Sequence, residues 1–191
     1  MEEAHTPAPG EPAIARADSI APGTALGDYL ERTRTYGVAR FVLEMSVLAL
    51  LLRIPAVIVS VQLGVIEDAT TAEELLEQFG LVALAVLALI WAPIAETVLF
   101  QWAPIEALRR FGAPAALAAV GSATVFALLH FQSGVAAILV HIPTGLVLAW
   151  CYLAWRPAGV GKALLVTTGV HFFLNLLAIG AAAISLGGGG A

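Results

Sequence analysis

Seven side chains that could carry chemistry lie in otherwise apolar stretches of the sequence. Six are ionisable and one is an amide: Glu44, Arg53, Glu96, His130, His141, His171 and Asn175. Carboxylates and imidazoles can transfer protons, whereas imidazoles and amides can also donate hydrogen bonds to a developing negative charge. Ionisable groups are expensive to keep inside hydrocarbon, so each of these side chains is a candidate for function.

Two spacings place pairs of these candidates on common helix faces. His171 and Asn175 are four residues apart, and so are Phe126 and His130. Four residues turn a helix by about 400°, so the members of each pair project from one face, one turn apart. Glu96 has no basic residue close to it in the chain. Any partner of Glu96 must therefore come from another segment.

Glu44 and Arg53 are less promising as functional residues. They are nine residues apart, which puts them on opposite faces of one helix, so they cannot pair directly. Arg53 can extend its guanidinium toward the membrane interface. We expect structural roles for both.

The elements that carry these residues are predicted from composition and from the spacing of charges. Of 191 residues, 60% are hydrophobic and 12% are charged, and the mean hydropathy is +0.90. A soluble domain has about 25% charged residues. No Asp, Glu, Lys or Arg occurs in three long stretches, 78–95, 111–155 and 163–191. Because a helix needs about 20 apolar residues to cross a bilayer, we predict five membrane helices at 38–60, 79–104, 114–131, 135–155 and 163–185.

The predicted fold class is all-α: a polytopic membrane bundle of about five helices around an intramembrane polar cavity. Depth in the bilayer can be counted at 1.5 Å per residue from the cytoplasmic end of each helix. On this count Glu96, His130, His171 and Asn175 lie roughly 14–24 Å deep, so they can meet inside the bilayer. Flanking this domain, 28–186, we expect a disordered Pro- and Ala-rich segment at 1–27 and a flexible Gly-rich tail at 187–191.

The distribution of charge predicts the orientation. With five crossings, the basic residues before the first helix (Arg32, Arg34, Arg40), after the second (Arg109, Arg110) and between the last two (Arg156, Lys162) fall on one side. The loop after the first helix is acidic and has no Lys or Arg. The positive-inside rule then makes the N-terminus cytoplasmic and puts the C-terminus on the opposite side. The Ala-, Gly- and Pro-rich composition suggests a bacterial inner membrane.

Several function classes find no support in the sequence. The net charge of −5 gives no basic footprint for nucleic acid. A nucleotide-binding Gly-x-x-x-x-Gly-Lys motif does not occur. The single cysteine, Cys151, lies in an apolar run, where we expect its thiol to be inert. Ser122 and Ser133 flank His130 in the chain but form no recognisable Ser/His/Asp or Ser/Lys set.

Three motifs, in this order along the chain, resemble the CPBP intramembrane proteases. They are Glu96-Thr97-Val98-Leu99-Phe100-Gln101, Phe126-Ala127-Leu128-Leu129-His130 and His171-Phe172-Phe173-Leu174-Asn175. This family includes the CAAX prenyl endopeptidases and bacterial relatives linked to bacteriocin immunity, the ABI proteins, and the resemblance covers about residues 80–180. The first motif of the family is usually Glu-Glu-x-x-x-Arg. Here Thr97 and Gln101 replace the second Glu and the Arg, which removes two opposite charges together.

The resemblance implies an intramembrane endopeptidase that acts on a membrane-anchored peptide or protein. It implies that Glu96 and His130 activate a water. His171 and Asn175, one turn apart, could then donate hydrogen bonds to the developing oxyanion. Supporting roles around the substrate cavity fall to Thr97, Phe100, Gln101, Phe126 and His141, although a structural role is favoured for His141.

The need for a metal stays open from the sequence. His130, His171 and Glu96 could hold Zn²⁺ with one position left for water. Because Glu96 would then be lost as the base, we favour a reaction that requires no cofactor. Two other functions remain alternatives: a non-proteolytic scaffold or immunity-type factor, which the altered first motif favours, and a proton or ion carrier.

Overall fold

The computed structural model describes residue 32, residues 37–65, residue 80 and residues 82–188 of the chain. The described residues form helices and short connections. The expected disordered segment 1–27 lies outside them, as does the end of the expected tail, 189–191. The last helix continues to Gly188, so the first two residues of the expected tail, 187 and 188, are helical.

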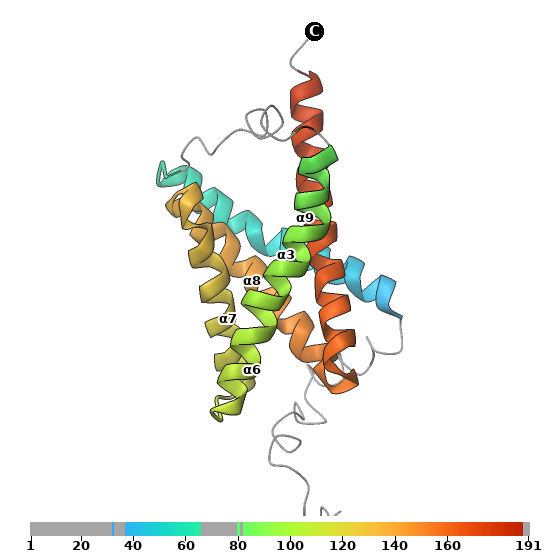
Figure 1. Ribbon diagram of the computed structural model, residues 1–191. Helices are drawn as coiled ribbons and strands as arrows, with labels where there is room; N and C mark the ends of the chain where they lie inside the picture. Colours follow the sequence, from blue (N-terminus) through green and yellow to red (C-terminus); the bar gives the residue numbers. More distant parts are fainter. Residues whose placement is uncertain (1–31, 33–36, 66–79, 81, 189–191) are drawn as a thin grey trace, which may run out of the picture.

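Five helices build the bundle (Figure 1). The first is α3 (Val38–Gln62). The second is continuous over Val82–Arg110 and contains η1 (Leu87–Trp91), α5 (Ala92–Glu96), η2 (Thr97–Trp102) and α6 (Ala103–Arg110). Next come α7 (Ala115–Leu129), a 3-10 turn η3 (His130–Ser133), α8 (Val135–Trp155), a second 3-10 turn η4 (Arg156–Ala158) and α9 (Val160–Gly188).

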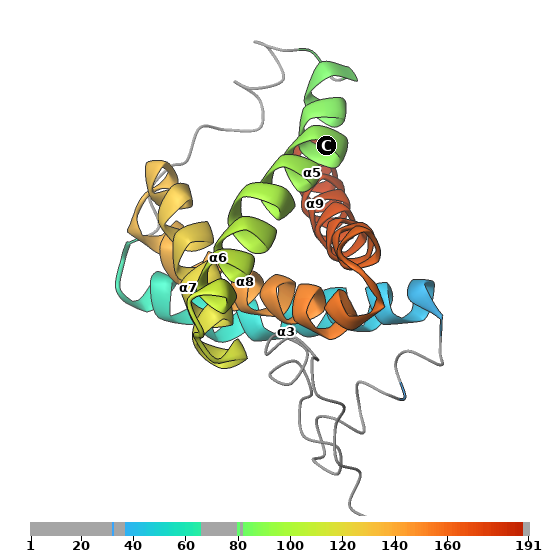
Figure 2. The same ribbon diagram turned by 60° about the horizontal axis from the view of Figure 1, so that its bottom comes forward.

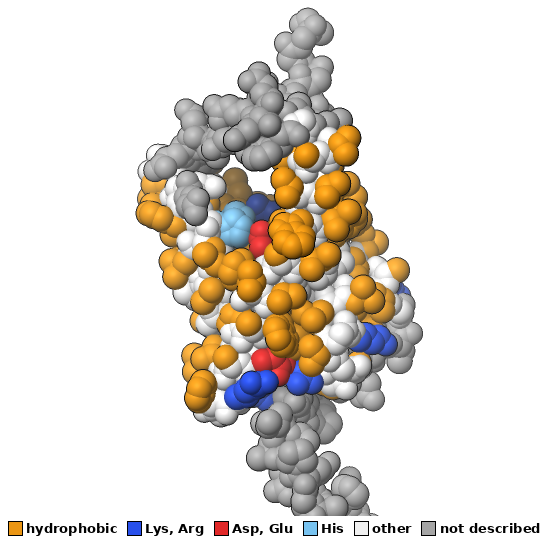
Figure 3. Space-filling view, viewed as in Figure 1, with side chains coloured by type: hydrophobic (Ala, Val, Ile, Leu, Met, Phe, Trp, Pro, Cys, Tyr) orange, Lys and Arg blue, Asp and Glu red, His pale blue; other side chains and the backbone are white. Residues whose placement is uncertain are grey.

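Four of these helices are long and apolar enough to cross a membrane, whereas α7 is shorter. Its 15 residues span about 22 Å, less than the ~30 Å of a hydrocarbon core. Many large apolar side chains are exposed, among them Leu51, Val61 and Leu165 at 57–69%, and Figure 3 shows apolar side chains spread over the visible face. The protein is therefore an integral membrane protein, and the expected all-α bundle is confirmed.

The second helix runs six residues past its expected end at 104. Pro104 has no backbone N–H to donate to the carbonyl of Phe100, and its ring crowds that carbonyl, so a helix normally ends or kinks there. Here a π-helical segment, η2, ends at Trp102, shortly before this proline, and a second one, η1, ends at Trp91, shortly before Pro93. These wider turns accommodate both prolines, and the helix continues to Arg110.

The other helices pack around the core that α8 and α9 form. Figure 2 shows α3 lying along α8, while α9 lies beside the helix that carries α5. On one side of α3, Phe41, Met45 and Ala49 are fully or almost fully buried in this core. Gly145 lets α7 approach α8 closely, because a Cβ at this position would lie only 2.9 Å from Cα of Ala123.

Charged groups mark one end of the bundle. The side-chain hydroxyl of Tyr152 donates to Glu106 at 2.6 Å, and the Arg156 guanidinium binds both oxygens of the same carboxylate. Arg109 and Arg110 end α6 nearby in the chain, and Lys162 lies in the first turn of α9. In Figure 3 basic side chains lie beside an acidic group at this lower end, and another basic side chain lies higher up, in a hollow with a histidine and an acidic group.

Candidate active site

Glu96, the last residue of α5, lies between two imidazoles from other helices. Its Oε2 is 3.6 Å from Nε2 of His171 in α9 and 3.9 Å from Nε2 of His130 at the end of α7. These distances are too long for direct hydrogen bonds but suit ion pairs or a shared water. The partners that the sequence required for Glu96 therefore come from two other helices.

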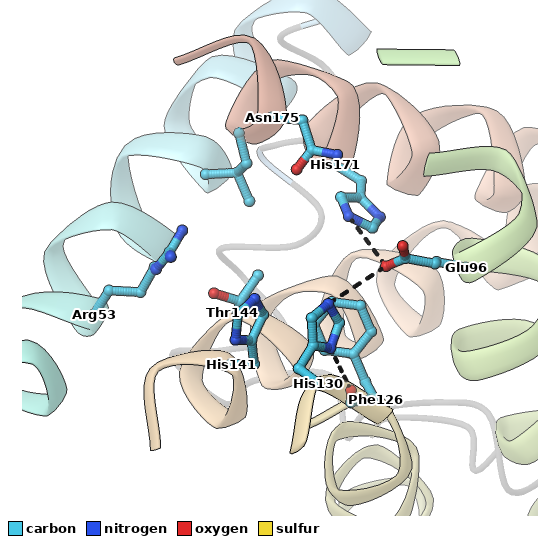
Figure 4. Close-up of a pocket in the computed structure, with 9 residues that line it drawn as sticks. Arg53, Glu96, Phe126, His130, His141, Thr144, His171 and Asn175 are labelled. Atoms are coloured by element: carbon cyan, nitrogen blue, oxygen red, sulfur yellow. Dashed lines mark hydrogen bonds and ion pairs between the residues drawn. The ribbon is translucent and has the colours of Figure 1, made fainter. Parts of the chain in front are cut away.

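The three groups line a cavity of about 80 Å³ inside the bundle (Figure 4). A cavity this size has room for several waters. It is open rather than sealed, because 24% of the Glu96 side chain and 26% of the His130 side chain are exposed. The full lining consists of Arg53, Glu96, Phe126, His130, His141, Thr144, His171, Leu174 and Asn175.

The tautomer of His130 follows from its backbone contact. Its Nδ1 lies 2.8 Å from the carbonyl oxygen of Phe126. A carbonyl only accepts hydrogen bonds, so Nδ1 carries the proton and Nε2 of the neutral ring is an acceptor that faces Glu96. His141 is held in the same way, with Nδ1 2.7 Å from the carbonyl of Ala137. A water between Glu96 and His130 would therefore meet two acceptors.

Phe126 positions all three histidines. Its ring is 1% exposed and lies 4.7 Å from the His130 ring, 5.9 Å from the His141 ring and 5.7 Å from the His171 ring, between centroids. The rings of His130 and His141 also stack on each other, 3.8 Å apart and 13° from parallel. Close packing of this kind leaves the imidazoles little rotational freedom.

Asn175 has a backbone partner that the sequence did not reveal. In the π segment each backbone N–H bonds to the carbonyl five residues earlier, as the N–H of Ala92 does to the carbonyl of Leu87. The next pair in this register is Pro93 and Ala88, but Pro93 has no N–H. The carbonyl of Ala88 therefore lacks a backbone donor, and Nδ2 of Asn175 supplies one at 2.8 Å. One N–H of this amide is thus engaged, and the other remains for the cavity that Asn175 lines.

Ser122 makes a second side-chain contact with the helix that carries Glu96. Its hydroxyl lies 2.7 Å from the carbonyl of Phe100 and 2.6 Å from Oε1 of Gln101. Ser122 therefore joins α7 to the helix that carries Glu96. This contact gives the serine a structural role.

The expected supporting residues divide into two groups. Phe126 and His141 line the cavity, whereas Thr97, Phe100 and Gln101 do not. Thr97 and Gln101 are completely buried, and Phe100 packs against the hydrophobic core. The two positions at which the first motif differs from the family pattern, Thr97 and Gln101, therefore lie outside the cavity, in the packing around the helix that carries Glu96. Cys151 is a buried free thiol.

Sequence reasoning missed two residues of the cavity wall that carry polar groups. Arg53 was recognised as an intramembrane charge but was expected to extend toward the interface, and Thr144 was not considered. The position of Arg53 in the helix could have indicated this, because nine residues separate it from the end of α3. Its counterpart Glu44 pairs with Arg40 at 2.7 Å, away from the cavity.

The donor set does not fit a metal centre in this geometry. Within the described part of the chain, no group of three or more His, Cys, Asp or Glu side chains is arranged to hold a metal ion. His130, His171 and Glu96, the set considered from the sequence, do not form such a group. We therefore derive no step through a metal.

The family model of the type II CAAX prenyl endopeptidases, Rce1-like, matches residues 78–177. The chain belongs to this Rce1-like family. The matched region covers more than half of the chain and contains Glu96, Phe126, His130, His171 and Asn175, which agrees with the CPBP resemblance in the sequence. Arg53 lies outside it. No curated protein matches the chain, and no solved structure does.

Proposed function

We propose that this Rce1-like protein is an intramembrane endopeptidase that hydrolyses a peptide bond of a membrane-associated substrate. The observation that carries the proposal is the approach of Oε2 of Glu96 to the Nε2 atoms of His171 and His130, at 3.6 and 3.9 Å, in an open cavity within the bundle. One carboxylate and two imidazoles from three helices supply a base, a water-orienting group and a hydrogen-bond donor.

Glu96 and His130 activate the water. The water donates one hydrogen to the Glu96 carboxylate and the other to Nε2 of His130, which directs its lone pair toward the substrate carbonyl carbon. As the oxygen–carbon bond forms, Glu96 accepts the proton. General-base catalysis of this kind contributes about 10²–10⁴-fold to a rate.

His171 and Asn175 stabilise the tetrahedral intermediate. His171 is 6% exposed and its Nδ1 has no hydrogen-bond partner among the described residues, so the ring is free to adopt the tautomer with its proton on Nε2. That N–H and the second N–H of Asn175 donate to the oxyanion. The intermediate then collapses, the carbon–nitrogen bond breaks, and Glu96 returns its proton to the leaving amine.

The orientation and location are part of this proposal. The basic residues at one end of the bundle support a cytoplasmic N-terminus, with the C-terminus on the opposite side, and the Ala-, Gly- and Pro-rich composition supports a bacterial inner membrane.

Cleavage by the purified protein in liposomes, with a library of membrane-tethered peptides, tests the activity. The reaction is run in water enriched in ¹⁸O, and the products are identified by mass spectrometry. We expect one new C-terminus per cleavage that carries one ¹⁸O atom. Absence of cleavage across the library, together with full complementation of a gene deletion by the Glu96→Gln variant, would instead favour a scaffold or immunity-type role.

A further inference from the structure

The buried apolar core fills the part of the bundle between the cavity and the charged end at Arg156 and Lys162, which we call the basic end. The ring of Trp155 lies 5.5 Å from the ring of Phe41, between centroids, and Lys162 lies over the same indole. Each large side chain of this layer is at most 3% exposed. Its members are Phe41, Ile105, Leu148, Tyr152, Trp155 and Val166.

On the other side of the cavity, the described helices bury little apolar surface. From Arg53 to the end of α3, and from Asn175 to Ala181 in α9, no apolar side chain is buried. The turn η3, which joins α7 to α8 on this side, is exposed at Ser133. The cavity is therefore closed by packed side chains toward the basic end, and no comparable layer of described residues closes it toward the opposite end.

The short helix α7 adds to this asymmetry. It begins directly after Pro114, four residues beyond Arg110 at the basic end. Its 15 residues cover about 22 Å of a ~30 Å hydrocarbon core, so His130, which follows it, lies short of the opposite membrane surface. The hollow in Figure 3 with a histidine and an acidic group likewise lies away from the charged lower end. Water thus reaches Glu96 and His130 from the end opposite the basic residues.

We propose that the cavity opens toward the extracytoplasmic face and that the protein acts on peptides displayed there. The inference rests on the proposed peptidase function and on the orientation in which the basic end is cytoplasmic. A cytoplasmic peptide would have to pass the packed layer around Tyr152 and Trp155 to reach Glu96, whereas a peptide on the opposite side meets the open end. The substrate class is then an exported polypeptide that stays anchored in the membrane. The reaction that supplies this substrate is transport of the polypeptide across the membrane.

Thiol labelling tests the opening independently of cleavage. Cys151 is the single cysteine of the chain and is buried, so an introduced cysteine gives a defined signal. Thr144→Cys places a thiol in the cavity wall, Ser133→Cys places one in the exposed turn η3, and Phe111→Cys places one at the basic end, at a position that is 89% exposed. Each variant is treated with a small, charged methanethiosulfonate in sealed spheroplasts and in sealed inverted vesicles.

We expect the thiols at positions 133 and 144 to react in spheroplasts and the thiol at position 111 to react only in inverted vesicles. The unmodified protein, with Cys151 alone, should react in neither preparation. Reaction of the thiol at position 144 in inverted vesicles, from the same side as the thiol at position 111, would overturn the proposal. Reaction of the thiol at position 133 in inverted vesicles would overturn it as well, because the open end would then be cytoplasmic.

A cleavage assay on the unmodified protein needs no substitution. A tethered peptide that cannot cross the membrane is added to sealed vesicles of either orientation. We expect cleavage by right-side-out vesicles, and none by inverted vesicles until detergent opens them. Cleavage by sealed inverted vesicles would overturn the extracytoplasmic opening but leave the peptidase function in place. Absence of cleavage in both preparations and in detergent, with labelling as expected, would support the opening and overturn the peptidase function.

Discussion

The side-chain amide of Asn175 lies 2.8 Å from the carbonyl of Ala88 and replaces the backbone N–H that Pro93 cannot supply. One residue of the proposed oxyanion site thus also holds the π-helical turn that precedes Glu96. The contact joins α9 to the helix of the catalytic carboxylate. The position of Glu96 relative to His171 therefore depends on a proline and the amide that compensates for it.

Asn175→Ala should lower the free energy of unfolding by about 1–3 kcal/mol, because it leaves the partly buried carbonyl of Ala88 unpaired. The loss should be smaller when Pro93→Ala is also present, since residue 93 then provides an N–H. Unfolding in mixed micelles, measured for both single variants and the double variant, checks this coupling. Additive effects of the two changes would show that Asn175 does not compensate for Pro93.

Ser122→Ala should also destabilise the protein, by about 1–3 kcal/mol. The hydroxyl that contacts the carbonyl of Phe100 and Oε1 of Gln101 is lost, while the Gln101 oxygen remains buried and the Phe100 carbonyl partly buried. Ser133→Ala is the matched control, because Ser133 is exposed and its loss should have little effect. Thermal unfolding in detergent compares the two variants, and equal melting temperatures would contradict the structural role of Ser122.

His130 and His141 should differ strongly in catalysis although their rings stack. His130→Ala should reduce kcat by about 10²–10⁴-fold, because it removes an acceptor that orients the water. His141 has no contact of this kind with Glu96 in the described structure, so His141→Ala should reduce kcat by about tenfold at most through looser packing of His130. The cleavage rate of each variant, normalised to the amount of folded protein, tests this difference. A loss in His141→Ala as large as that in His130→Ala would reverse the assignment.

Removal of divalent metal should leave cleavage intact. Glu96, His130 and His171 do not form a metal-binding group in this geometry, and the proposed reaction uses Glu96 as a base. The purified protein is treated with EDTA and 1,10-phenanthroline, dialysed and assayed in liposomes. Loss of cleavage that Zn²⁺ restores would show that these side chains serve as metal ligands.

Much of the bundle could be predicted from the sequence, because bilayer crossing imposes a length and an apolar composition on each helix. The five helices lie close to their expected positions. The predicted end of the second helix at 104 was wrong, because the helix continues past Pro104 to Arg110, and nothing local in the sequence reveals the π segment before this proline. The 15 residues of α7 likewise fall short of the length expected for a crossing.

The site was predictable only in part. Glu96, His130, His171 and Asn175 were found because polar groups are rare in apolar helices and because their motifs resemble a family. Their packing depends on contacts between residues farther apart in the chain, such as those of the Phe126 ring with the imidazoles of His141 and His171. The positions of Arg53 and Thr144 on the cavity wall depend on how α3 and α8 cross, which helical periodicity in one segment does not specify.

The most direct test of the account is the cleavage rate of Glu96→Gln in liposomes, compared with Glu44→Gln. Both changes replace a carboxylate by an amide of the same shape, but Glu44 pairs with Arg40 away from the cavity. We expect Glu96→Gln to lose at least about 10²-fold in kcat while it stays folded, and Glu44→Gln to retain the rate of the unmodified protein. Cleavage by Glu96→Gln at the unmodified rate would contradict the central claim that this carboxylate activates the water.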